Sequence, residues 1–160
     1  MQWLIPISVK YPAAYRIHVG YCKSHTKTPM AHDIPVLQAP DGRTVSTRLP
    51  LGTAQIIAPQ PSDARLGEKR YWIICLFTSY AYGGRADPVD QIINNTHAAL
   101  QDLQRQLREL HEKGAAAPDA LYACRFNSGL FAVPWAKTRK LIEDVGPEMT
   151  VVYPVNDVNV

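Results

Sequence analysis

Residues 125–135, with the sequence RFNSGLFAVPW, combine the residue types of an anion-binding turn. Asn127, Ser128 and Gly129 favour a tight turn, and Gly129 lets the backbone approach a ligand closely because it has no Cβ. Pro134 marks the start of a helix directly after the turn, and a helix N-terminus adds a positive dipole. Backbone N–H groups that point outward from such a turn can bind phosphate oxygens. We therefore expect phosphate binding here, with a plain strand-to-helix connection as the alternative that spacing alone leaves open.

The turn is placed by the elements on either side of it. An apolar run at residues 121–126 predicts a strand, residues 135–145 predict a helix that stops at Gly146, and residues 149–154 predict a second strand. Strand, helix and strand with short connections form a parallel crossover unit, which is almost always right-handed. Because ligands of such sheets bind beyond the carboxyl ends of the strands, the turn lies where a ligand is expected.

The remaining chain predicts further strands at residues 53–59 and 71–79, and the second is apolar nearly throughout, as strands covered on both faces are. A long amphipathic helix follows, capped by Asp87, started by Pro88 and ended near Gly114. Its apolar stripe comprises Val89, Ile92, Ile93, Thr96, Leu100, Leu103, Leu107 and Leu110. A first helix is expected at residues 12–25, and residues 24–48 are interpreted as a long loop insertion with one hairpin at Asp41 and Gly42.

Composition limits the class of protein. The chain has 160 residues, 46% hydrophobic and 19% charged, which fits a single domain over residues 1–160. Its formal net charge of +3 comes from scattered basic residues, so an anionic small molecule is a better partner than a nucleic acid. No apolar run is long enough to span a membrane, and no signal peptide is recognisable. Three cysteines cannot all pair, so a reducing compartment, cytoplasm or nucleus, is expected.

The residue pattern does not match the active sites of two known kinds of phosphatase. No cysteine precedes an arginine at the spacing of a cysteine phosphatase, and Asp87 and Asp90 begin a helix instead of following a strand as a phosphorylated aspartate would. The metal-ligating residue types gather only at Cys22, His25, His32 and Asp33, in a spacing that matches no closed zinc site. No metal and no cofactor are expected.

Three segments, CLFTSYAYGGR, NSGLFAVPWAKTRKLIEDV and YPAAYRI, resemble the macro domain family in its branch of fungal-type ADP-ribose 1''-phosphate phosphatases. The resemblance covers most of residues 11–154 apart from the long loop. It implies an α/β fold of three layers, a mixed sheet between helices, in which residues 127–131 wrap the diphosphate and distal ribose of ADP-ribose. Phe131 would cover an apolar ligand face. The candidate ligand-binding residues are Asn127, Ser128, Gly129, Leu130, Phe131, Ala132, Thr78 and Ser79.

Two departures from the family pattern accompany the resemblance. The position of Ala132 is usually glycine, so a positive φ there would strain the alanine by about 1–2 kcal/mol. The family's first strand, an acidic residue that binds adenine, and a Gly-rich loop precede the YPAAY helix, where this chain has MQWLIPISVK. The resemblance implies that the catalytic residues lie in that part, so no catalytic residue is assigned, and the fold is expected to be N-terminally incomplete.

The expected function is therefore that of an ADP-ribose 1''-phosphate phosphatase, a phosphoric monoester hydrolase that binds the phosphates of ADP-ribose and removes the 1''-phosphate. The expected ligand is ADP-ribose 1''-phosphate or ADP-ribose, and the expected state is a monomer. Two alternatives stay open. The chain could be a catalytically inactive ADP-ribose-binding module, or a fragment that is not stable by itself because an unpaired strand edge is left exposed.

Overall fold

The computed structural model describes residues 7–26, 36–38, 44–46, 50–64, 69–81 and 83–153. The chain divides into two compact units. The first comprises Met1–Asp33 and Gln55–Cys75, and the second comprises Ile34–Ala54 and Leu76–Val160. Each unit is described by itself below.

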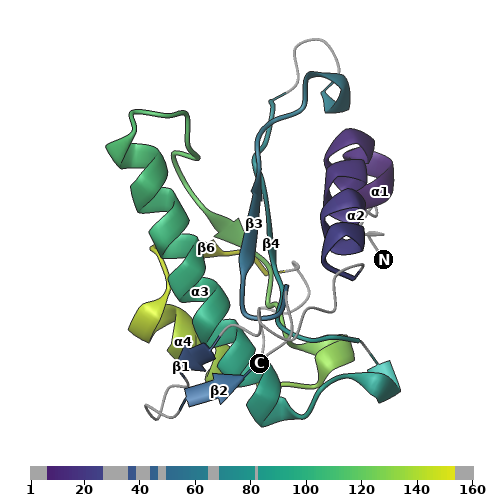
Figure 1. The fold of residues 1–160 in the computed structure, drawn as a ribbon, viewed down its shortest axis with the longest axis vertical. Coiled ribbons are helices and arrows are strands. Elements are labelled where there is room, and N and C mark those ends of the chain that lie inside the picture. The colour runs from purple at the N-terminus through teal and green to yellow at the C-terminus, as the bar shows by residue number, and fades with distance from the viewer. Residues whose placement is uncertain are drawn as a thin grey trace. The chain divides into compact units, whose positions relative to one another are not determined.

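The first unit contains two helices, α1 (Ile7–Lys10) and α2 (Pro12–Thr26), which lie against each other (Figure 1). Pro12 begins α2 as predicted, because proline has no N–H to leave unpaired at a helix start. The short 3₁₀ turn η1 (Pro61–Asp63) contacts α2. Asp63 caps α2, since its two carboxylate oxygens accept hydrogen bonds from the N–H groups of Ala13 (2.7 Å) and Ala14 (2.8 Å).

Strands β3 (Ala54–Ile57) and β4 (Ile73–Leu76) pair in a two-stranded sheet and are shorter than the sequence predicts. Their pairing ends in a G1-type β-bulge. Gly52, with φ 73°, donates to the carbonyl of Phe77 (2.8 Å), and Phe77 donates to the carbonyl of Thr53 (3.0 Å). Every residue of β4 is only half-buried. The expectation of a strand covered on both faces was therefore wrong.

The second unit contains the crossover unit that the sequence predicts. Strand β5 (Tyr122–Ala123) pairs in parallel with β6 (Thr150–Val151), in the register Tyr122↔Thr150, and helix α4 (Trp135–Val145) connects them. Helix α4 packs against the long helix α3 (Val89–Glu112) (Figure 1). A hydrogen bond from Nε2 of Gln104 to the carbonyl of Gly146 (3.0 Å) joins α3 to the end of α4.

The predicted hairpin is confirmed as strands β1 (Val36–Gln38) and β2 (Thr44–Ser46), which pair antiparallel, with β1 against α3. The turn at Asp41 and Gly42 lies outside the described residues. The structure thus confirms a macro-domain-like α/β class with both parallel and antiparallel pairs. Its described strands pair as three two-stranded sheets.

Helix α3 matches the predicted stripe but begins differently. Pro88 takes the N-cap position without a side-chain cap, and Asp87 instead accepts a hydrogen bond from the N–H of Tyr80 (2.8 Å). The prediction that Asp87 caps this helix was wrong, because its carboxylate closes the preceding loop. Gly114, with φ 59°, ends α3 in a Schellman motif, as Ala115 donates to the carbonyl of Leu110 (2.9 Å).

The core of the second unit is built around α3, in which residues 95–100 are all buried. Ile92, Leu100 and Leu103 of α3, Val133 and Leu141 are all buried. Burying an aliphatic side chain of this size contributes about 1.5–3 kcal/mol of free energy to folding, so the stripe accounts for the docking of α3. None of the helices in the described part of the chain has the length and hydropathy of a membrane span.

Candidate functional site

The turn after β5 reverses the chain through left-handed backbone conformations. Asn127 has φ 64°, Gly129 has φ 69° and Ala132 has φ 54°. Residues 129–131 form the 3₁₀ turn η3 (Gly129–Phe131), and Ala132 donates to the carbonyl of Gly129 (3.0 Å). We call residues 127–132 the 127–132 loop. Ala132 thus has the positive φ at which we expect an alanine to be strained.

The side chain of Asn127 is buried, with 2% of the residue exposed, and is hydrogen-bonded on both sides. The hydroxyl of Thr78 donates to Oδ1 of Asn127 (2.8 Å), and Nδ2 of Asn127 donates to the hydroxyl oxygen of Thr96 (2.7 Å). The carbonyl of Asn127 accepts a hydrogen bond from the N–H of Val133 (3.0 Å), which closes the base of the loop. Asn127 therefore attaches the loop to its neighbours and does not present its amide to solvent.

The outer part of the 127–132 loop presents backbone donors. The N–H groups of Ser128, Gly129 and Leu130 meet no hydrogen-bond acceptor among the described residues. Gly129 and Leu130 are exposed, Leu130 to 69%. Helix α4 begins at Trp135, three residues after the end of the loop. Pro134 is its N-cap, and the helix has no side-chain cap and no acidic residue in its first turn. Unpaired N–H groups beside an uncapped helix N-terminus form an environment that attracts anions.

Two further side chains of the loop are partly enclosed. The hydroxyl oxygen of Ser128 is buried and has no hydrogen-bond partner in the part of the chain that the structure describes. Phe131 is half-buried. On either side of the loop in sequence, Phe126 and Trp135 contact each other edge to face, with ring centroids 6.5 Å apart. The loop is thus flanked by aromatic rings.

Thr78 and Ser79 follow β4, and their side chains bond to the protein. Thr78 is buried and donates to Asn127, whereas the hydroxyl of Ser79 donates to the carbonyl of Ala81 (2.7 Å) and accepts from the N–H of Asp87 (3.0 Å). Both residues belong to the hydrogen bonding that sets the loops in place. Among the sequence-predicted residues, Leu130 and Ala132 have exposed side chains.

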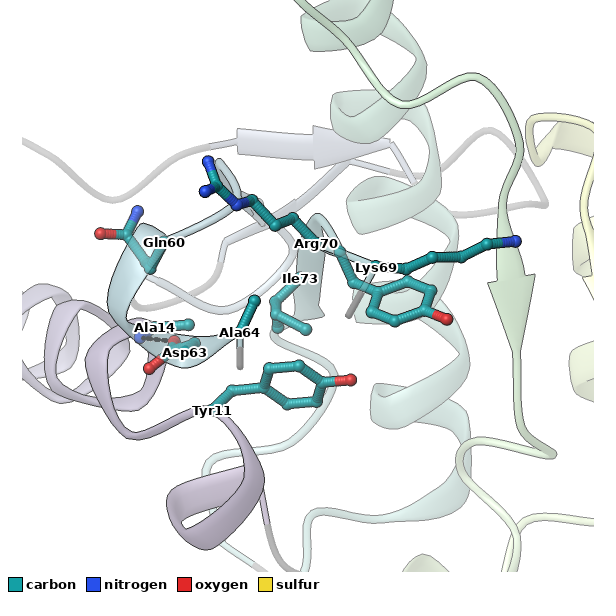
Figure 2. Close-up of a pocket in the computed structure, with 9 residues that line it drawn as sticks. Tyr11, Ala14, Gln60, Asp63, Ala64, Lys69, Arg70 and Ile73 are labelled. Atoms are coloured by element: carbon teal, nitrogen blue, oxygen red, sulfur yellow. Dashed lines mark hydrogen bonds between the residues drawn. The ribbon is translucent and has the colours of Figure 1, made fainter. Parts of the chain in front are cut away.

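The first unit contains a small surface pocket lined in part by Tyr11, Asp63, Lys69 and Arg70 (Figure 2). Figure 2 shows the Asp63 carboxylate directed at the start of α2, with the cationic ends of Lys69 and Arg70 pointing away from each other. The carboxylate of Asp63 accepts hydrogen bonds from backbone N–H groups, and the two cationic side chains point in different directions. This arrangement is that of a helix cap beside an aromatic pair, Tyr11 and Tyr71, at 6.4 Å.

The histidine and cysteine residues of α2 are hydrogen-bonded within the first unit. Sγ of Cys22 lies 3.7 Å from Nε2 of His18, whose Nδ1 lies 3.0 Å from Oε1 of Gln55. Burial raises the pKa of the Cys75 thiol to about 11, which keeps it protonated. In the described ranges no three His, Cys, Asp or Glu side chains gather as metal ligands would, and His32 and Asp33 lie outside those ranges.

Comparison with known proteins places the chain in a family. The ADP-ribose 1''-phosphate phosphatase of Aspergillus fumigatus is 43% identical over 151 residues, covering 91% of this chain and 76% of that protein. The protein of the same name from Neosartorya fischeri is 42% identical over 151 residues, with the same coverage. The chain belongs to the ADP-ribose 1''-phosphate phosphatase family. A more distant relative of the same name, from Debaryomyces hansenii, is 31% identical over 154 residues. No protein-family model matches the chain.

Membership of the ADP-ribose 1''-phosphate phosphatase family confirms the resemblance drawn from the three sequence segments. Sequence reasoning missed Asn95 and Thr96, which contact the loop region from α3: Nδ2 of Asn95 donates to the carbonyl of Thr78 (3.0 Å). A signal existed, because Thr96 is a polar residue within the apolar stripe of the predicted helix. A buried polar side chain requires partners, and the Thr96 hydroxyl has two, the carbonyl of Ile92 and Nδ2 of Asn127.

Proposed function

We propose that this chain binds ADP-ribose 1''-phosphate through its 127–132 loop and releases inorganic phosphate from it. The observation that carries the proposal is the set of N–H groups of Ser128, Gly129 and Leu130, which have no acceptor in the described structure and lie beside the N-terminus of α4. Phosphate oxygens are natural acceptors for such donors. The names of the family members add the identity of the ligand.

The residues of the candidate site have different roles in this proposal. Gly129 keeps the ligand's path to the backbone open, since no atom lies within 4 Å of the place where a Cβ would be. The backbone N–H of Ser128 provides a donor to the ligand, and Phe131 packs on the ligand's apolar face. Asn127 and Thr78 position the 127–132 loop, and Ser79 positions the segment between β4 and α3. In hydrolysis, the oxygen of water bonds to phosphorus, the bond from phosphorus to the ester oxygen breaks, and the proton that water loses ends on that oxygen, which leaves as a hydroxyl of ADP-ribose. The loop donors stabilise negative charge on the phosphoryl oxygens. We further propose that the protein acts as a monomer in the cytoplasm or nucleus.

The test is phosphate release from ADP-ribose 1''-phosphate by the purified chain and by Gly129→Val. Valine is strongly disfavoured at φ 69°, so the variant changes the backbone of the loop, at a position where an added Cβ would meet open space. We expect turnover by the chain and loss of most of it in the variant. Leu107→Val, on α3, is a matched control and should keep its activity. Equal turnover by Gly129→Val and the unmodified chain would contradict the assignment of the loop.

A second candidate, an ADP-ribose-binding module without chemistry, is favoured by one observation. Residues 127–132 include no titratable side chain, so the loop supplies donors but no general acid or base. Isothermal titration calorimetry with ADP-ribose, together with the phosphate-release assay, separates the two candidates. Binding of ADP-ribose without release of inorganic phosphate from ADP-ribose 1''-phosphate would favour the module. Binding together with phosphate release would favour the phosphatase.

A further inference from the structure

We propose that Thr96, on α3, is a positioning residue for the 127–132 loop and acts on it through the side-chain amide of Asn127. The inference rests on the proposed function of that loop and adds a residue that lies outside it. Thr96 and Asn127 are 31 positions apart in sequence, and both are buried. Their contact is therefore a tertiary one, between the long helix and the start of the loop.

The direction of each hydrogen bond fixes the orientation of the Asn127 amide. The hydroxyl of Thr96 donates its proton to the carbonyl of Ile92 (2.6 Å), so its oxygen is left to accept from Nδ2 of Asn127 (2.7 Å). Oδ1 of Asn127 then faces Thr78, whose hydroxyl donates to it (2.8 Å). With Thr96 at 0% exposure, water has no access to replace either bond.

The residue of α3 directly before Thr96, Asn95, supports the other side of the same amide through Thr78. Nδ2 of Asn95 donates to the carbonyl of Thr78 (3.0 Å), and Nε2 of Gln91 donates to Oδ1 of Asn95 (3.0 Å). Helix α3 thus reaches Asn127 twice, directly from Thr96 and indirectly through Thr78. A network in which each member is partnered defines one geometry more strongly than any single bond does.

This network sets the loop before a ligand arrives. Asn127 occupies a left-handed conformation at φ 64°, which few non-glycine residues adopt unless their surroundings favour it. With its amide bonded to Thr78 and Thr96 and its carbonyl bonded to Val133, the residue fixes the direction in which Ser128 and Gly129 leave it. The N–H groups proposed to bind phosphate are thereby preorganised by α3.

The test compares Thr96→Val, which removes the hydroxyl at nearly constant volume, with Thr96→Ser, which keeps it. Leu103→Val, two turns further along α3, controls for a general loss of stability. Two readouts are measured well below the melting temperature: hydrogen exchange of the Val133 amide, which donates to Asn127, and the affinity for ADP-ribose by calorimetry. Thr78→Val removes the other bond to the same amide and serves if Thr96→Val does not fold.

We expect Thr96→Val to speed Val133 exchange and weaken ADP-ribose binding by about tenfold each, because the buried amide loses its acceptor. Thr96→Ser should restore both values, and Leu103→Val should lower the melting temperature without weakening ADP-ribose binding. Exchange and affinity in Thr96→Val equal to those of Leu103→Val would overturn the proposal. If the unmodified chain binds no ADP-ribose, the proposed function fails, and the exchange rates of the variants still decide the role of Thr96.

Discussion

Replacing Ala132 by glycine should stabilise the protein. Ala132 has φ 54° and ψ 23°, and an L-residue with a Cβ pays about 1–2 kcal/mol in this left-handed region. Glycine removes that strain but gives the unfolded chain more freedom, which costs about 0.4–1 kcal/mol. The net gain is about 0.5–1 kcal/mol, which for a chain of this length corresponds to a rise in melting temperature of about 1–4 °C. Because Ala132 is exposed, the change removes no buried contact.

A matched control separates strain from the general effect of glycine. Ala136 is also exposed but lies within α4, where the backbone is right-handed. Ala136→Gly should therefore lower the stability, by up to about 1 kcal/mol. Differential scanning calorimetry of both variants tests the pair, since the same chemical change is expected to have opposite signs. A lower melting temperature in both variants would refute the assignment of strain to Ala132.

Three further predictions follow from contacts in the structure. Gly146→Ala should destabilise the end of α4 by about 1–3 kcal/mol, because a Cβ there would lie 2.7 Å from the carbonyl oxygen of Ile142; urea denaturation measures this, and an unchanged midpoint would contradict it. Asp63→Ala should cost about 1 kcal/mol by uncapping α2, seen as lost helical circular dichroism on heating, with Asp119→Ala as the exposed control. Burial raises the pKa of Cys75 from 9.0 to about 11, so its thiol should be alkylated at pH 8 more slowly than that of exposed Cys124; equal alkylation rates by mass spectrometry would disprove this. Because the unfolded chain loses this proton first, the contribution of the Cys75 thiol to the free energy of unfolding should fall as the pH rises from about 9 to about 11.

Local signals in the sequence predicted the helices well. The stripe of apolar residues placed α3, and Pro12 and Gly146 placed the start of α2 and the end of α4, because each of these signals acts within one or two turns of the chain. The parallel pairing of β5 and β6 also followed from local order, since the connecting helix is short. The positive φ of Ala132 was expected only through the family resemblance.

Long-range contacts account for what the sequence did not predict. Asp87 looked like a helix cap, but its carboxylate bonds to Tyr80, whose position depends on the loop between β4 and α3. The apolar run around β4 looked like a strand covered on both faces, yet its residues are half-exposed in a two-stranded sheet. The sequence did not predict the hydrogen bonds of the Asn127 side chain, because its partners, Thr78 and Thr96, are brought to it by the tertiary fold.

The central claim, that the 127–132 loop binds the phosphates of ADP-ribose, is tested most directly by NMR of the backbone amides. The N–H signals of Ser128, Gly129 and Leu130 would be followed while ADP-ribose is added to the purified chain, with adenosine as the ligand that lacks phosphates. We predict saturable shifts of these three signals with ADP-ribose and little change with adenosine. Binding of ADP-ribose that leaves all three signals in place, or no binding at all, would contradict the claim.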